Sequence, residues 1–159
     1  MRLTVMAVGR LKAGPERILV ERYLERSAPL ARTLGFGTVD VVELPESRAK
    51  RAAERKAEEA AAIVARCGNG IVLAFDETGA SMPSPVFAER CASWRDKGVD
   101  SINFVIGGAD GLDARVHARA DGLMAFGAAT LPHQLVRILV AEQIYRAMTI
   151  LTGHPYHRV

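Results

Sequence analysis

The 159-residue sequence has only two cysteines, Cys67 and Cys91, which stand too far apart for a metal-ligand spacing. So few thiols are typical of a reducing compartment, and we expect a cytoplasmic protein. His154 and His157 lack a neighbouring carboxylate or thiol in sequence, so no metal site is expected. The cysteines also lack a sequence-adjacent acid–base partner, which leaves a cysteine nucleophile without support.

Long hydrophobic runs are also absent. No stretch reaches the roughly 18 apolar residues of a membrane span, and the opening "MRLTVMAVGRL" lacks the long apolar run and cleavage site of a signal peptide. We therefore expect no membrane association. Hydrophobic residues make up 49% and charged residues 25%, as in a soluble globular protein, and the length suits one domain. The net charge of +3 permits a nucleic-acid partner without requiring one.

Short apolar runs alternate with helical patterns along the chain. Strands are expected at 3–8, 38–44, 70–76, 101–107 and 122–127, and helices at 15–34, 48–67, 84–96, 113–120 and 131–151. Ser47 is expected to cap the second helix, and Ser84, followed by Pro85, the third. Strands that are apolar on both sides and alternate with helices predict one α/β domain, with a largely parallel sheet covered on both faces.

The last expected helix is apolar around nearly its whole circumference. Only Glu142, Arg146 and Thr149 form a narrow polar sector between residues 134 and 151. Because an all-round apolar helix needs cover on every side, we expect a homodimer interface, with full burial inside the monomer as the alternative.

Three loops follow the third, fourth and fifth strands: "DETGASMPS", "GGADGLD" and "GAATLPHQ". Parallel sheets bind ligands at the carboxyl ends of their strands, and small residues let the backbone approach a ligand closely. "GGADG" is not a dinucleotide fingerprint, since Ala109 replaces a needed glycine, and no P-loop is present. The loops predict a ligand site; tight structural turns are the alternative.

Isolated polar residues give weaker signals. The mixed charges of residues 46–66 are typical of a solvated helix face. His117 is expected at the surface, and His133 in a capping or packing role. Scattered cations are candidates for phosphate contacts: Arg10, Lys12, Lys97, Arg137, Arg146 and Arg158.

Four motifs together carry a family resemblance. They are "AVGRLK" (7–12), "FVIGGADGL" (104–112), "ATLPHQLVRILVAEQIYRA" (129–147) and "HPYHR" (154–158). In this order and spacing, over almost the full length, the sequence resembles the bacterial SPOUT methyltransferases that methylate a pseudouridine of 23S ribosomal RNA at N3.

The resemblance implies a single SPOUT domain over residues 1–159, with a deep trefoil knot in approximately residues 70–159, and a homodimer. It implies S-adenosylmethionine as the cofactor, bound by matching positions: Phe75, Gly108, Gly127, Ala128, Ala129, Thr130, Leu131 and Pro132. The family often has leucine where Phe75 stands, so the adenine pocket is expected to shift slightly.

The resemblance also implies a catalytic group on the RNA side of that pocket: His154, Tyr156, His157, Arg158 and Arg146. As hypotheses, a histidine accepts the N3 proton, an arginine holds a phosphate or developing negative charge, and Tyr156 stacks on the base. The implied substrate is a stem-loop of 23S ribosomal RNA in the assembled ribosome. Two alternatives stay open: a SPOUT enzyme with another rRNA or tRNA target, and a non-catalytic ribosome-binding relative.

Overall fold

In the computed structural model, which describes residues 1–158, five parallel strands pair in the order β2-β1-β4-β3-β5. The strands are β1 (Arg2–Val8), β2 (Val39–Leu44), β3 (Ile71–Ser81), β4 (Ser101–Ile106) and β5 (Gly122–Ala125). Each expected strand is present. The parallel pairing follows from the helix that connects every strand to the next.

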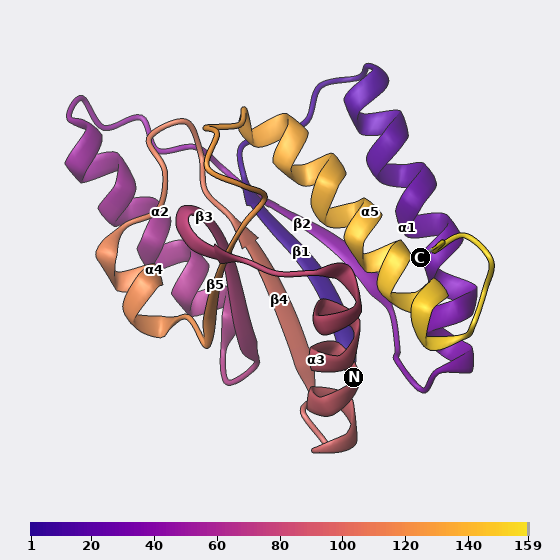
Figure 1. Ribbon diagram of the computed structural model, residues 1–159. Helices are drawn as coiled ribbons and strands as arrows, with labels where there is room; N and C mark the ends of the chain where they lie inside the picture. The colour runs from indigo at the N-terminus through magenta and orange to yellow at the C-terminus, as the bar shows by residue number, and fades with distance from the viewer. Residues whose placement is uncertain (159) are drawn as a thin grey trace.

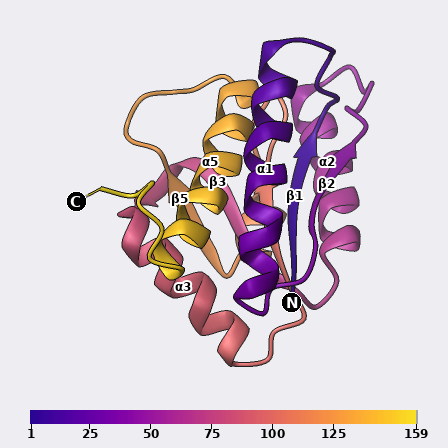
Figure 2. The same ribbon diagram turned by 90° about the vertical axis from the view of Figure 1, so that its right-hand side faces the viewer.

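Helices cover both faces of the sheet (Figure 1). The helices are α1 (Pro15–Thr33), α2 (Ala52–Cys67), α3 (Ser84–Asp96), α4 (Ala114–Arg119) and α5 (His133–Leu151). One face carries α1, α5 and α3, and the other carries α2 and α4 (Figures 1 and 2). The expected α/β architecture is therefore confirmed.

Alternating side chains of the strands build two cores. In β1, Leu3 and Val5 face the larger core under α1, α3 and α5, while Met6 and Val8 face the smaller core under α2 and α4. Every residue of β4 is buried, because the strand is central and covered on both sides.

Both expected serine caps are wrong. Helix α2 begins at Ala52, and the Ser47 hydroxyl instead donates to the Glu58 carboxylate, while the Ser47 N–H donates to Glu59 Oε1 (3.0 Å). Ser84 lies inside α3, whose flanking residue is Pro83, and its hydroxyl donates to Gln143 Oε1 of α5 (2.9 Å). Neither serine stands at the cap position, because α2 is flanked by Arg51, four residues after Ser47, and Ser84 already belongs to the first turn of α3.

Helix α5 obtains most of its cover inside the chain, between α1 and α3 (Figure 2). Val140, Ile144 and Met148 are buried, and Thr149 of the expected polar sector is buried as well, its hydroxyl donating to the Arg146 carbonyl. Leu135 is exposed at 45%. Packing within one chain thus largely explains why α5 is apolar around nearly its whole circumference. The homodimer stays a prediction. None of the helices formed by residues 1–158 is long and apolar enough to cross a membrane.

The sheet opens where β3 and β4 end. The helix after β3 covers one face and the helix after β4 the other, which is the arrangement that leaves a crevice beside the strand ends. Beyond Phe75, β3 leaves β4 and continues along β5 alone, with a register shift before Ala80 pairs with Met124. The expected strand at 70–76 is therefore longer than the sequence indicated.

Gly79 makes this register shift possible. A Cβ atom at Gly79 would lie 2.6 Å from the backbone N and C of Met124. We expect Gly79→Ala to lower the free energy of unfolding by about 1–3 kcal/mol, because backbone must move to relieve the overlap. Thermal unfolding of the variant checks this. Gly14→Ala is the control, since its Cβ would meet only the Glu16 carboxylate at 3.4 Å. Equal melting temperatures for both variants would contradict the expected effect.

Candidate functional site

A cavity of about 700 Å³ lies at the carboxyl ends of β3, β4 and β5. This volume is within the usual range for small-molecule sites. The cavity is lined by the segments that the three loops contribute: Phe75–Glu77, Ile106–Leu112, Met124–Gly127 and Ala129–Gln134, with Val136. The predicted ligand site at this edge therefore has a physical counterpart in a cavity.

Most of the residues assigned to the cofactor by resemblance line this cavity. They are Phe75, Gly108, Gly127, Ala129, Thr130, Leu131 and Pro132, whereas Ala128 is exposed and does not line it. Sequence reasoning did not single out Asp76, Glu77, Asp110 and Phe126, which also line it. Their positions inside or directly beside the three small-residue loops could have indicated that they line the cavity.

Glycines bring the main chain close to the cavity. A Cβ atom on Gly108 would lie 3.1 Å from Val8 Cγ1 and 3.4 Å from Glu59 Oε2, so the loop fits tightly against the end of β1. Gly127 has φ of +113°, a conformation that side chains disfavour. The walls therefore present many peptide groups and few side chains.

Aromatic and polar groups complete the walls. The rings of Phe75 and Phe126 stack with centroids 5.3 Å apart, and the Thr130 hydroxyl donates to Glu77 Oε2 (2.9 Å). The cavity thus offers apolar surface, peptide donors and acceptors, and three carboxylates: Asp76, Glu77 and Asp110, the last of which is paired with Arg55. These are the complements of an adenine ring, a ribose and a positively charged sulfonium, so the residues fit S-adenosylmethionine.

His117, expected at the surface, is half-buried beside the cavity. Its Nε2 lies 3.1 Å from Asp76 Oδ2. Burial favours a higher pKa for Asp76, but hydrogen bonds from Thr78 and His117 outweigh it and lower the pKa of this carboxyl. His117 therefore helps to keep Asp76 ionised at the cavity wall.

The terminal segment forms a second cluster around Glu142. Glu142 Oε1 accepts from Arg146 Nε (2.9 Å), from Arg146 Nη2 (2.6 Å) and from the Tyr156 hydroxyl (3.1 Å). The Tyr156 ring lies against Tyr145, with centroids 4.7 Å apart, and 4.9 Å from the Arg146 guanidinium carbon. Arg146, Tyr156 and His157 therefore come together, while Arg158 is exposed. Glu142, which sequence reasoning placed only in a polar sector, is the centre of the cluster.

Both histidines of this segment use Nδ1 as an acceptor. Arg146 Nη1 lies 3.3 Å from His157 Nδ1, and the Tyr156 N–H donates to His154 Nδ1 at 3.2 Å. A guanidinium and a peptide N–H are donors only, so each neutral ring carries its proton on Nε2. In this arrangement both histidines present an N–H donor.

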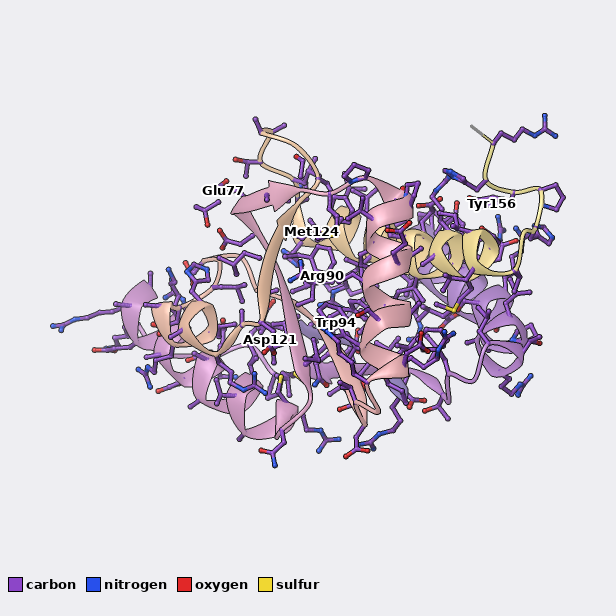
Figure 3. All side chains as sticks on the ribbon, turned by 60° about the horizontal axis from the view of Figure 1, so that its bottom comes forward. Glu77, Arg90, Trp94, Asp121, Met124 and Tyr156 are labelled. Atoms are coloured by element: carbon purple, nitrogen blue, oxygen red, sulfur yellow. The ribbon has the colours of Figure 1, made fainter. Side chains whose placement is uncertain are left out.

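The terminal cluster and the cavity lie apart in one chain. None of the five residues assigned to catalysis lines the cavity. The cavity extends along the first turn of α5 to Val136, and the cluster reaches back only to Glu142, about 9 Å further along the helix at 1.5 Å per residue. Figure 3 shows Glu77 and Tyr156 well separated. In this structure, therefore, the tail of one chain does not line the cavity of the same chain.

Tyr156 gives a spectroscopic test of the cluster. Burial raises the pKa of its phenol, and the charge of Glu142 with their hydrogen bond raises it further. We expect Glu142→Gln to lower this pKa, because the uncharged amide no longer disfavours the phenolate. Ultraviolet titration checks this, with Tyr156→Phe identifying the signal among the three tyrosines. An unchanged titration curve in Glu142→Gln would contradict the contact.

Arg137 is the clearest error among the expected phosphate contacts. Its side chain is 2% exposed and donates to protein carbonyls and to Glu43, so it is not available to RNA. Among the 158 described residues, no group of three or more histidine, cysteine, aspartate or glutamate side chains is placed to hold a metal ion.

Comparison with known proteins identifies the class. Residues 1–157 match the model of a family described as predicted SPOUT methyltransferases, and the chain belongs to that family. A probable methyltransferase from Bordetella pertussis Tohama I has the same fold, with a TM-score of 0.50 at 14% identity over 92% of this chain and 95% of that one.

Two close relatives carry a more specific name than the family does. A protein of Methylorubrum populi is 59% identical over 99% of this chain and 97% of its own length. One from Methylobacterium nodulans is 60% identical over 99% of this chain and 98% of its own. Both are named ribosomal RNA large subunit methyltransferase H.

Proposed function

We propose that this protein is an S-adenosylmethionine-dependent methyltransferase that acts on N3 of a pseudouridine in 23S ribosomal RNA. The observation that carries the proposal is the cavity at the carboxyl ends of β3, β4 and β5, with its walls of glycine and other small residues. The full-length similarity to large-subunit rRNA methyltransferases supports this substrate. We further propose that the protein works in the cytoplasm, on the assembled ribosome.

The bound cofactor would supply the methyl group, which moves to the base by in-line displacement at the sulfonium. Gly108, Gly127 and the 129–132 segment would hold the cofactor through peptide groups, and the stacked Phe75 and Phe126 would supply the apolar wall beside its adenine. Asp76 and Glu77 would favour the positive charge of the donor. The chain's main contribution is then to hold donor and acceptor close and in line.

The terminal cluster would act on the RNA. Because His154 and His157 present Nε2–H, we propose that they donate to the uracil oxygens and stabilise the negative charge that develops as N3 gives up its proton to a water molecule. A histidine acting as the base would first have to give up its Nδ1 hydrogen bond. Tyr156 would hold the cluster together, and the exposed Arg158 would contact phosphate.

Because the cavity and the terminal cluster lie apart in one chain, a second copy of the chain would be needed to join them. We propose that the 154–158 segment of one chain completes the cavity of its partner, which would bring the two clusters of functional residues into one site. The exposed Leu135, at the cavity end of α5, suits such an interface. We also propose the family's trefoil knot within approximately residues 70–159. In support, the chain passes from α4 on one face, through the edge strand β5, to α5 on the other.

Two measurements test the proposed function. Calorimetric titration with S-adenosylmethionine should show saturable binding. Incubation with labelled cofactor should then methylate 23S ribosomal RNA in ribosomes, and mass spectrometry of the digested RNA should place the methyl group on N3 of a pseudouridine. Methylation of another rRNA or of tRNA would redirect the assignment within the family. Failure to bind the cofactor with or without ribosomes would leave a non-catalytic relative.

A further inference from the structure

Arg137 is the most deeply buried charged residue among residues 1–158. It lies in the second turn of α5, and its Nη2 donates to the carbonyl oxygens of Val8 (2.7 Å) and Gly9 (2.6 Å). Its Nη1 donates to Glu43 Oε1 at 2.9 Å, and its Nε has no partner. One side chain thus joins the start of α5 to the ends of β1 and β2.

This arrangement is costly for a purely structural contact. Burial lowers the pKa of the Arg137 guanidinium, and only the Glu43 carboxylate and neighbouring acidic charge oppose this effect. Apolar residues of similar volume usually fill such a place with equal or greater stability, and an unpaired buried N–H adds to the cost. A buried cation retained under these conditions calls for a role that depends on its fixed, forked geometry.

This guanidinium connects the segments that support two opposite walls of the cavity. Val8, whose carbonyl Arg137 holds, is the residue against which Gly108 packs, with only 3.1 Å between Val8 Cγ1 and a Cβ on that glycine. The opposite wall, which we call the 127–136 wall, consists of Gly127, residues 129–134 and Val136, and it continues into the helix that carries Arg137. Glu43 Oε1 also accepts from the Leu11 N–H at 2.7 Å, which extends the network into the loop after β1.

We propose that Arg137, oriented by Glu43, is a positioning residue that sets the distance between the Gly108 wall and the 127–136 wall of the cofactor cavity. This inference rests on the proposed function, because it assigns the network to that same cofactor site. Arg137 does not itself line the cavity; it acts through Val8 and through the first turns of α5.

Arg137→Lys and Glu43→Gln test the inference without removing the side chains. Lysine keeps the charge but cannot make the three forked hydrogen bonds, and we expect a Kd for S-adenosylmethionine at least about tenfold higher, measured below the unfolding transition. Glu43→Gln should act in the same direction. Hydrogen exchange without cofactor should accelerate across residues 127–136 and stay unchanged in α2.

Arg95→Lys is the matched control. Arg95 also donates to a distant carbonyl, that of Leu34 (2.8 Å), but both residues shortly precede strands and so lie at the amino ends of the sheet, away from the cavity. The Arg95→Lys variant should have a lower melting temperature but bind the cofactor with an affinity within about twofold of the wild type. Wild-type affinity and exchange in Arg137→Lys, despite a lower melting temperature, would overturn the inference. If the wild-type chain does not bind S-adenosylmethionine at all, the proposed function fails, and the exchange pattern alone decides whether Arg137 positions the 127–136 wall.

Discussion

Replacing Gly108 with valine should lower the affinity for S-adenosylmethionine by about 10- to 100-fold. The new Cβ would lie 3.1 Å from Val8 Cγ1 and 3.4 Å from Glu59 Oε2, and valine adds two methyl groups beyond it. The neighbouring Gly107 lies close to the other end of the loop, since a Cβ built on it would be 3.0 Å from the Gly111 carbonyl carbon, so a local adjustment has little room. The whole 107–111 loop must therefore shift into or away from the cavity.

Calorimetry with the cofactor measures this effect directly. Ala118→Val provides the control, because it adds the same two methyl groups at an exposed position of α4, shortly after the same loop. The control should bind as the wild type does. If Gly108→Val also binds with wild-type affinity, the cofactor does not occupy this cavity.

Mixed dimers should regain activity that neither parent variant has. A cavity variant, Gly108→Val, and a tail variant, His154→Ala with Arg158→Ala, should each methylate ribosomes at least about 100-fold more slowly than the wild type. Co-expressed, the two chains form heterodimers in which one composite site has an intact cavity and an intact tail. Random pairing then restores about a quarter of the wild-type activity per site.

The sharpest control uses both defects in one chain. A triple variant, combined with wild-type chain in the same ratio, also leaves about a quarter of the composite sites intact, and it shows whether exchange between dimers is complete. Activity near the parental background in the mixture of cavity and tail variants, with about half of the wild-type activity in the mixture of triple variant and wild-type chain, would mean that each tail serves its own chain. The two-chain site would then be wrong.

Much of the architecture could be predicted from local patterns. Strands such as residues 101–106 are apolar on both sides, and only a sheet covered on both faces buries them completely. The three small-residue loops were identified for the same kind of reason: the carboxyl ends of parallel strands meet at one edge. The cavity lies at that edge, and the second and third loops supply most of its lining, whereas the first loop contributes only Asp76 and Glu77.

The features that escaped prediction all depend on partners far along the chain. His117 meets Asp76 41 residues away, and Arg137 meets carbonyls 128 and 129 residues away. A lone arginine among apolar helix residues is usually read as solvent-exposed, and nothing local reveals an acceptor at the end of a distant strand. Similarly, the serine hydroxyls at 47 and 84 are taken by side chains of other segments.

One feature could have been predicted and was not. A helix of 19 residues is about 27 Å long, so the segments before and after α5 begin at opposite ends of the domain. The sequence alone therefore implied that "LPHQ" and "HPYHR" meet only if the tail returns along the whole helix or a second chain supplies it. The tail returns as far as Glu142.

The attachment of the terminal segment to its own helix has a thermodynamic consequence. A free five-residue tail would lose conformational entropy on meeting RNA, at about 1–2 kcal/mol for each backbone residue fixed. Here the contacts of Tyr156 and His157 with Glu142, Tyr145 and Arg146 fix most of that segment during folding. RNA binding is then left with little ordering to do, so its heat capacity change should report buried surface and not coupled folding.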